Sequence, residues 1–220
     1  MFNPSFASFA LKLLEGVLYS FSLGGKCLVL CLPFSLFCAF LFKKENLVTK
    51  SFLSILDVVI ALPNQLLLLS IAGLAGGSIG AILISIFITQ VPGLIRHLRV
   101  YVIQAHSYEY VEAARALGAS RLRLFFVHIL PRLFLPLSIS ALSLLKRVIL
   151  SESLLMFLGL GFDPLTPSLG RLLSEGRSYL FLSPERFLLP ALLLFLLLYI
   201  LQSVCDRFSS LFDPKGVRYL

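Results

Sequence analysis

The side chains with the clearest potential for chemistry lie in one charged segment of an otherwise apolar chain. Residues 108–132, YEYVEAARALGASRLRLFFVHILPR, hold acids, arginines and a histidine, whereas the whole sequence is 58% hydrophobic and 14% charged. Acids and arginines beside small alanines can form ion pairs and close contacts with another molecule. We therefore ask which elements carry this segment and which surface it occupies.

The first half of the segment predicts a short helix with one smooth face. At helical spacing that face collects Tyr110, Ala113, Ala114 and Leu117. Glu112 and Arg115 form an i,i+3 pair beside it. Gly118 can provide a left-handed stop, and Ser120 can cap a second helix. Because the exposed face is small, another backbone or a shallow pocket could approach it closely.

The second half predicts a helix that anchors the first. Its apolar side comprises Leu122, Phe125, Phe126 and Ile129, and we expect Pro131 and Pro136 to mark where it bends toward the membrane. The segment as a whole is then a helix–turn–helix elbow.

A second group of charges interrupts an apolar run further along the chain. Lys146, Arg147 and Glu152 fall where a membrane span is expected, and charges in a span are costly unless they face a cavity or a partner. Two interpretations stay open. The cations either form an internal ion pair with Glu152 or snorkel, or they line a transport pathway and attract an anionic group such as a peptide carboxylate.

Neither a nucleotide site nor a metal site is predicted. The Gly-Gly-Lys at 24–26 is followed by Cys27, and Ser20 stands where a phosphate-binding loop needs glycine. Cys27, Cys31 and Cys38 lie in an apolar run, where cysteine usually behaves as a small hydrophobic residue. We expect no catalytic residue, no metal and no cofactor bound by this chain.

Composition and apolar runs predict the elements that position these groups. The mean hydropathy is +0.96 over 220 residues, which indicates an all-α polytopic membrane helix bundle. One span fits residues 16–42, two fit 51–95 with a break at the Gly-rich 73–80, a fourth begins near Leu133, and a fifth covers 187–204. About five spans are expected.

The distribution of lysine and arginine predicts the orientation. The net charge of +8 could suggest nucleic acid, but in a membrane protein such an excess marks cytoplasmic loops. The basic loops are 43–50, 96–132 and the tail 206–220, which we place in the cytoplasm. The turn at 73–80 and the loop 159–186 then lie outside. Five spans also put the N-terminus outside.

Three interpretations of the 96–132 loop compete on the residues alone. It could be an amphipathic loop on the membrane surface. It could be a DNA-binding helix–turn–helix, since Ala114, Gly118 and Leu124 have suitable spacing and arginines suit phosphates. Its tethering between two spans argues against DNA. It could also dock a soluble motor subunit.

The third interpretation is supported by a resemblance to a family. The segment resembles the EAA signature of inner-membrane permease subunits of ABC importers, in which the matching residues are Glu112, Ala113, Ala114, Gly118, His128, Leu130 and Pro131. DVVIALP (57–63) and SLLMFLGLGFDPLTPSLGRLLSEGRSYL (153–180) resemble further segments of its dipeptide/oligopeptide/nickel branch. The resemblance runs from about Glu15 to the tail. It divides the chain into an N-terminal segment (1–15), a transmembrane domain (16–205) and the tail.

The resemblance implies a fold, a role and partners. The fold would be a type I ABC importer transmembrane domain, and the elbow would be its coupling helix, seated in a groove of an ATPase subunit where Glu112 pairs with a basic group. The implied partners are a second permease subunit, two ATPase subunits that bind the ATP, an extracytoplasmic substrate-binding protein and the lipid bilayer, with no nucleic acid. The cargo would be peptides or a similar small nutrient, and the location a bacterial-type inner membrane.

One departure from the family pattern concerns the start of the chain. Family members usually have another span before the part that matches, so the N-terminal span is expected to be missing here. A truncated, non-transporting permease therefore stays open as an alternative.

Overall fold

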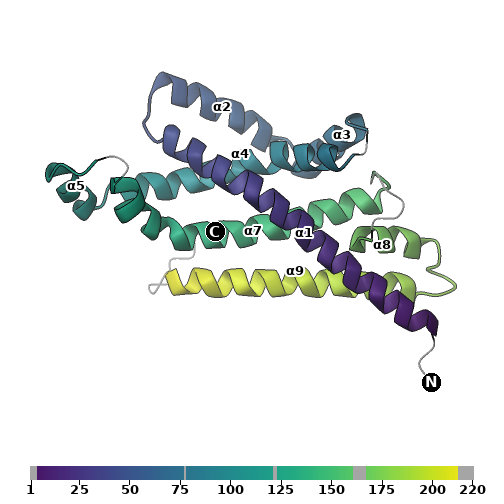
Figure 1. Ribbon diagram of the computed structural model, residues 1–220. Helices are drawn as coiled ribbons and strands as arrows, with labels where there is room; N and C mark the ends of the chain where they lie inside the picture. The colour runs from purple at the N-terminus through teal and green to yellow at the C-terminus, as the bar shows by residue number, and fades with distance from the viewer. Residues whose placement is uncertain (1–3, 77, 121–122, 161–166, 213–220) are drawn as a thin grey trace.

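The structure, a computed structural model, describes residues 4–76, 78–120, 123–160 and 167–212. Its helical elements are α1 (Pro4–Leu41), α2 (Leu47–Ala61), α3 (Asn64–Leu74), α4 (Ile79–His106), α5 (Glu109–Ala116), the π-helix η1 (Leu124–Ile129), α7 (Leu130–Phe157), α8 (Leu169–Arg177) and α9 (Glu185–Phe212) (Figure 1). No strand occurs in these ranges, which confirms the all-α prediction. Parts of the expected 159–186 loop (161–166) and of the expected tail (213–220) lie outside the described residues.

The described chain contains four long apolar helices and one bent helix pair that can cross a membrane. The four are Ser8–Leu41, Ile79–His106, Leu124–Phe157 and Glu185–Ser210, and the bent pair is α2 with α3. α1 and α4 run in the same direction, because the ring of Phe40 lies 5.4 Å from that of His106 while Lys26 and Leu83 line a common cavity further back. The α2–α3 pair must therefore carry the chain back across, in agreement with about five spans.

The second span is not straight, which the apolar pattern did not predict. α2 and α3 meet at an angle of 90° at Leu62 and Pro63. A residue before proline is disfavoured in α conformation, and Leu62 is extended with φ −76° and ψ 141°. The expected break at 73–80 is confirmed, because Gly76 turns the chain with φ +73° and the Ser78 hydroxyl accepts a hydrogen bond from the Ala81 N–H at 3.1 Å.

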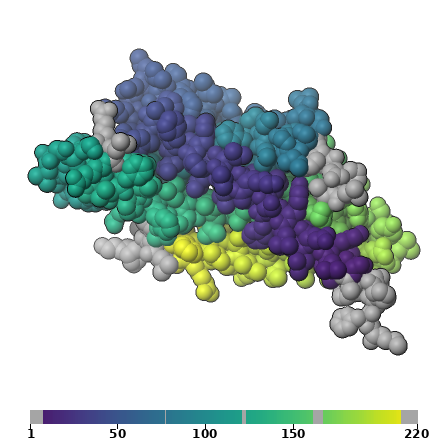
Figure 2. All heavy atoms as spheres, in the orientation of Figure 1, coloured from purple at the N-terminus to yellow at the C-terminus, as the bar shows by residue number. Residues whose placement is uncertain are grey.

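α1 crosses diagonally over the other helices and packs against α4, α7 and α8 (Figures 1 and 2). A stripe of small buried residues, spaced three or four apart, forms its inner face: Gly16, Ser20, Gly24, Cys27, Cys31, Ser35 and Cys38. Small side chains let helix backbones approach closely in a membrane. At Gly24 an added Cβ would lie 2.3 Å from Cδ1 of Leu145 on α7.

α8 lies at the end of the bundle that carries the N-terminus, and α9 runs from there along the length of the bundle (Figure 1). The Ser168 hydroxyl caps α8 by accepting from the Arg171 N–H at 3.2 Å. An added Cβ on Gly170 would lie 2.1 Å from the Ser153 carbonyl oxygen, and one on Gly176 would lie 2.6 Å from that of Arg186. Glycine at these positions therefore lets α8 press against both α7 and α9.

Candidate functional site

The elbow at 108–132 projects from the bundle at the end opposite the N-terminus (Figure 1). α5 is a single short helix anchored by Val111, whose side chain is fully buried. Glu112 and Ala113 are exposed, while Ala114 is half-buried against the core. Of the two alanines predicted for the docking face, Ala113 is thus the one open to a partner.

The turn after α5 has the predicted geometry. Gly118 adopts φ +81°, and an added Cβ there would meet nothing within 4 Å. Its N–H donates to the Arg115 carbonyl at 3.0 Å, and the Ala119 N–H donates to that of Ala114 at 3.1 Å. The Ser120 hydroxyl accepts from the Arg123 N–H at 3.3 Å, so the expected cap is confirmed. Glycine is required here by backbone conformation and not by space.

The second half of the elbow differs from the prediction. Leu124–Ile129 forms a π-helix that joins α7 in one continuous helix, with Pro131 and Pro136 inside it. The Leu130 N–H donates to the Phe125 carbonyl five residues earlier, so this turn holds one residue more than an α-helical turn. The next residue, Pro131, has no N–H to donate. The extra residue also changes which side chains face inward. Phe125 is half-buried and Ile129 buried, but Phe126 is exposed.

Aromatic contacts fasten the two halves of the elbow together. The Tyr110 hydroxyl donates to the His128 carbonyl at 3.5 Å, and the two rings lie 6.3 Å apart. Tyr108 stacks on Tyr110 at 5.6 Å and receives the Arg132 guanidinium over its ring at 5.2 Å. His128 thus lies in the joint of the elbow. The sequence did not predict a role for Tyr108 or Arg132. The ring and the cation are far apart along the chain, and only the turn after α5 brings them into contact.

The elbow is also joined to the C-terminal end of α1. Phe125 meets Phe40 edge-on at 4.9 Å, and Phe40 packs on His106 of α4. Nδ1 of His106 lies 2.8 Å from the Val102 carbonyl and its Nε2 lies 2.8 Å from the Lys43 ammonium. An Nδ1–H tautomer satisfies both contacts, because Nδ1 then donates and Nε2 accepts from lysine. Three helices therefore meet at the base of the elbow.

The intramembrane cations do not pair with Glu152. Lys146 donates to the Gln202 side-chain oxygen on α9, and the Gln202 amide donates to Asp206 at 2.8 Å. Arg147, the next residue on α7, is exposed and lies within electrostatic range of both His97 on α4 and Cys205 on α9. Among the described residues, no hydrogen bond or ion pair joins either cation to Glu152, so the internal ion pair does not form. A helix carries residues five or six apart to different sides, which separates them.

Glu152 is instead the centre of a buried hydroxyl cluster. Its side chain is fully buried, and Oε2 accepts from the Ser20 hydroxyl at 2.8 Å and from that of Ser153 at 3.5 Å. Ser168 at the start of α8 also hydrogen-bonds the carboxyl group. Oε1 has no protein partner. The cluster joins α1, α7 and α8 and lies away from the elbow.

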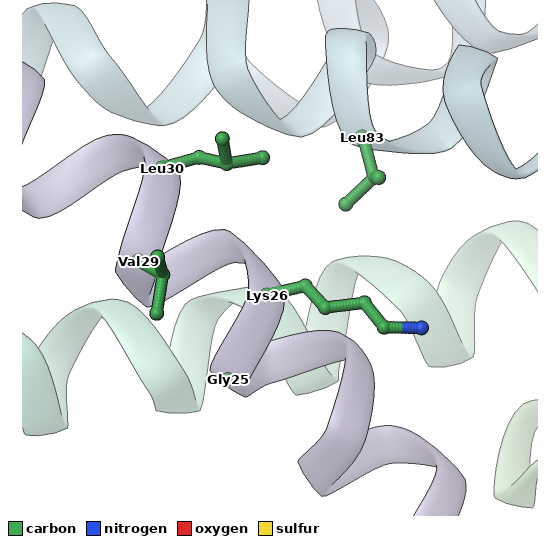
Figure 3. A pocket seen from close by; sticks show the side chains of 5 residues that line it. All are labelled: Gly25, Lys26, Val29, Leu30 and Leu83. Carbon is green, nitrogen blue, oxygen red and sulfur yellow. The ribbon is translucent and has the colours of Figure 1, made fainter.

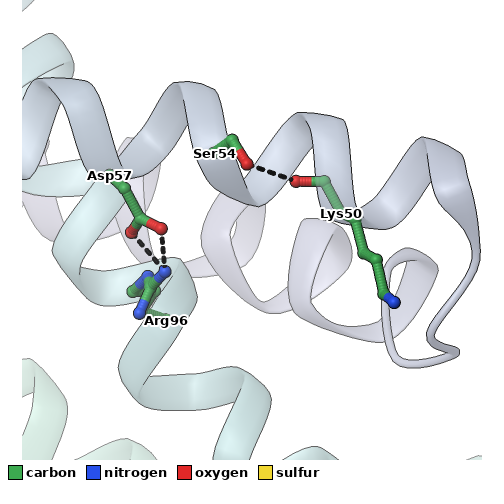
Figure 4. Close-up of polar contacts among 4 residues, drawn as sticks. All are labelled: Lys50, Ser54, Asp57 and Arg96. Atoms are coloured by element: carbon green, nitrogen blue, oxygen red, sulfur yellow. Dashed lines mark hydrogen bonds and ion pairs between the residues drawn. The ribbon is translucent and has the colours of Figure 1, made fainter.

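Two further polar features lie outside the elbow. Arg96 of α4 forms an ion pair with Asp57 of α2, and the two side chains face each other across the helices in Figure 4. Ser54, one turn before Asp57, donates to the Lys50 carbonyl at 3.0 Å. Both members of the ion pair are about half exposed, so its contribution to stability is small.

A cavity of about 530 Å³ opens between α1 and α4. Its lining comprises Gly25, Lys26, Val29, Leu30 and Leu83, and Figure 3 shows the Lys26 side chain extending across it. One amino group in an apolar lining does not define a ligand. The four cysteines are free and buried, and within the described ranges no three His, Cys, Asp or Glu side chains are grouped to hold a metal.

Comparison with known proteins identifies the family and the fold of this chain. The family model of the binding-protein-dependent transport system inner membrane component matches residues 32–216. Two chains of the MetNI methionine ABC transporter, crystallised in inward-facing conformations, superpose with TM-scores of 0.69 and 0.68 at 17% and 18% identity. The first alignment covers 93% of this chain and 96% of that one, and shows the type I importer fold.

Curated relatives add a similarity to peptide permeases. A di/tripeptide transport system permease protein, DppC of Pseudomonas aeruginosa, is 34% identical over 73% of this chain and 53% of its own length. A probable peptide ABC transporter permease of Sinorhizobium fredii is 30% identical over 74% and 56%. The glutathione transport system permease GsiD of Salmonella typhimurium is 30% identical over 73% and 53%. The chain thus spans about half the length of these relatives, and it belongs to the family of binding-protein-dependent transport system inner membrane components.

Proposed function

We propose that this chain is a permease subunit of an ATP-driven importer and forms half of the translocation pathway for peptides or a similar small nutrient. The observation that carries the proposal is the elbow, where exposed Glu112 and Ala113 lie on a short helix joined firmly to three longer ones. The names of the relatives, which include dipeptide and glutathione permeases, support the class of cargo.

In the proposed mechanism, the elbow receives movement from a separate ATPase. α5 seats in a groove of that subunit, with Glu112 paired to a basic group and Ala113 in close contact. Its displacement passes through Tyr110 and His128 into η1 and α7, and through Phe125 and Phe40 into α1. A rigid element of this kind moves as a unit, so closure of the ATPase pair would shift the helices that border the pathway. Leu130 and Pro131 continue the helix from elbow to span.

One exposed cation suggests how the pathway could bind its cargo. Arg147 lies in a span, exposed and beside His97, while Lys146 is held by Gln202. A span arginine open to a pathway would attract an anionic group such as a peptide carboxylate. We assign this role to Arg147, and to Lys146 the support of α9.

The proposal includes partners and an orientation. A second permease subunit would complete the pathway, two ATPase subunits would bind the ATP, and an extracytoplasmic protein would deliver the substrate. The 96–132 loop and the tail would face the cytoplasm of a bacterial-type inner membrane. DNA binding has less support, because the second helix of the elbow continues into a span and packs Phe125 and Ile129 inward.

The coupling role is tested by backbone strain at Gly118. In the assembled complex, Gly118→Val should reduce substrate-stimulated ATP hydrolysis and uptake while the protein remains in the membrane, because a left-handed conformation costs a side-chain-bearing residue about 1–2 kcal/mol. Gly118→Asn should retain more activity, since asparagine tolerates this conformation. ATPase assays and uptake into proteoliposomes measure both.

Gly76→Val provides a matched control. Gly76 has φ +73° and the same open surroundings, but it lies in the α3–α4 turn. The control should carry similar strain and keep coupling. If Gly118→Val leaves hydrolysis and uptake unchanged, the elbow does not couple. If the unmodified complex neither hydrolyses ATP in response to substrate nor takes up the substrate, the non-transporting alternative is correct. A salt-sensitive gel shift of DNA by the solubilised protein would favour DNA binding instead.

A further inference from the structure

Four consecutive large apolar side chains are exposed in the turn between α8 and α9. These residues, Tyr179–Leu182, which we name the apolar tip, have exposed fractions of 44%, 37%, 103% and 83% in chain order. Turns that face water are normally built from polar residues and glycine. A run of four exposed apolar side chains is therefore unfavourable in water and indicates a surface that is covered by something.

The apolar tip is held in a fixed shape. The Tyr179 N–H donates to the Gly176 carbonyl at 3.0 Å, and the N–H groups of Leu182 and Ser183 donate to the Tyr179 carbonyl at 3.0 and 2.8 Å. Gly176 lets α8 press against the first turn of α9, so the turn cannot swing freely about its base. The exposure of Phe181 is thus a property of the fold.

Its place along the chain points to the membrane surface. Only Ser183 and Pro184 separate the tip from Glu185, the first residue of the α9 span, at the end of the bundle opposite α5 (Figure 1). Only 6% of the apolar window of α9 is buried within this chain, and Leu188, Leu192 and Phe195 form an exposed apolar stripe that begins after Glu185 and Arg186. An apolar turn at the end of a span lies at the level of the lipid headgroups.

Two of the flanking charges suit that environment. Arg177 and Arg186 are exposed on either side of the tip, next to the exposed acids Glu175 and Glu185, of which Glu175 pairs with Arg171. The Arg186 guanidinium lies 5.1 Å from the ring centre of Tyr179, and that of Arg177 lies 5.9 Å from that of Phe157. Aromatic side chains with adjacent cations are typical of membrane interfaces, where the rings enter the acyl boundary and the cations meet phosphates.

We propose that the apolar tip is a membrane-interface anchor, with Phe181 and Leu182 inserted into the outer leaflet and Arg177 and Arg186 on lipid phosphates. The anchor fixes the level of α8 and of the start of α9 in the bilayer. This inference uses α9 as a span and goes beyond the proposed coupling at the opposite end.

A spin label at Phe181→Cys tests the anchor in the assembled complex, in nanodiscs of phosphatidylcholine and phosphatidylglycerol. The four native cysteines are buried, so unmodified protein reports the labelling background. Power saturation compares oxygen, which enters the bilayer, with a water-soluble nickel chelate. The label should be accessible to oxygen and shielded from nickel, like a lipid reference at Leu192→Cys and unlike an aqueous reference at Glu45→Cys.

Three other results would overturn the proposal. Nickel access equal to that of Glu45→Cys places the tip in water. Nickel access that disappears only when the binding protein is added makes the tip a docking site for that protein. Shielding from both reagents places the tip against the second permease subunit. None of these results bears on whether the elbow couples, so the two proposals fail separately.

Discussion

At the scale of single residues, the position of Glu152 is the main surprise. A carboxyl group buried in a span usually pairs with a cation, yet the nearest basic residues in the sequence, Lys146 and Arg147, point elsewhere. Hydroxyl groups from Ser20, Ser153 and Ser168 surround it instead. Its role is to hold α1, α7 and α8 together, because each hydroxyl comes from α7 itself or from a neighbour of α7.

This role predicts the effect of removing a hydroxyl. Ser20→Ala should lower the free energy of unfolding by about 1–3 kcal/mol, since it removes the hydroxyl that donates to the buried Glu152 carboxyl group at 2.8 Å. A thiol-reactive dye can follow thermal unfolding, because all four cysteines are buried until the helices separate. Ser22→Ala, an exposed hydroxyl on the same helix, is the control. Equal unfolding temperatures for the two variants would show that the cluster contributes no stability.

At the scale of elements, close helix crossings depend on small residues. The stripe on α1 lets that helix lie across three others, and Gly170 lets α8 touch the backbone of α7 at Ser153. With no apolar driving force between helices in lipid, such close packing supplies much of the association. The spacing of Gly16, Ser20, Gly24 and Cys27 was visible in the sequence and could have identified the inner face of α1.

Gly170→Ala should therefore destabilise the α7–α8 crossing. The added methyl would lie 2.1 Å from a backbone oxygen that cannot move by itself, and such overpacking costs about 1–3 kcal/mol. Gly93→Ala on α4 meets nothing within 4 Å and should raise stability slightly, by about 0.5–1 kcal/mol, through helix propensity. The thiol-dye assay compares them. A Gly170→Ala protein as stable as Gly93→Ala would mean that α8 is not clamped as described.

At the scale of the whole molecule, α1 and α4 run in the same direction, so the chain between them must cross the bundle an odd number of times. The bent α2–α3 pair supplies the return between them. The elbow follows α4, and α7 separates it from the apolar tip, so the two lie at opposite ends of the bundle (Figure 1).

The topology predicts opposite accessibility for two exposed sites. Ala75→Cys in the α3–α4 turn should react with a membrane-impermeant maleimide in intact cells, whereas Glu45→Cys before α2 should react only after permeabilisation. The native cysteines are buried and should stay unlabelled. Labelling of both sites from the same side would mean that α2 and α3 form a re-entrant loop and not a span.

The sequence alone determined the fold class, the approximate spans, the elbow and its left-handed glycine. These follow from local rules, because apolar length, helical spacing and the conformational freedom of glycine act within a few residues. The family resemblance rested on the same local motifs and is confirmed by the match over residues 32–216.

Only the tertiary structure decided what the charged and aromatic residues touch. Lys146 hydrogen-bonds Gln202, and Glu152 hydrogen-bonds Ser20. Phe125 packs against Phe40. The two partners of each contact are far apart in the chain. The π-helix before Pro131 changed which side chains of the elbow face inward, and the 90° bend at Pro63 divided the second span. The physical reason is the same in each case. A partner across a helix crossing is set by the angle and register of two helices, and these depend on how all the helices pack together.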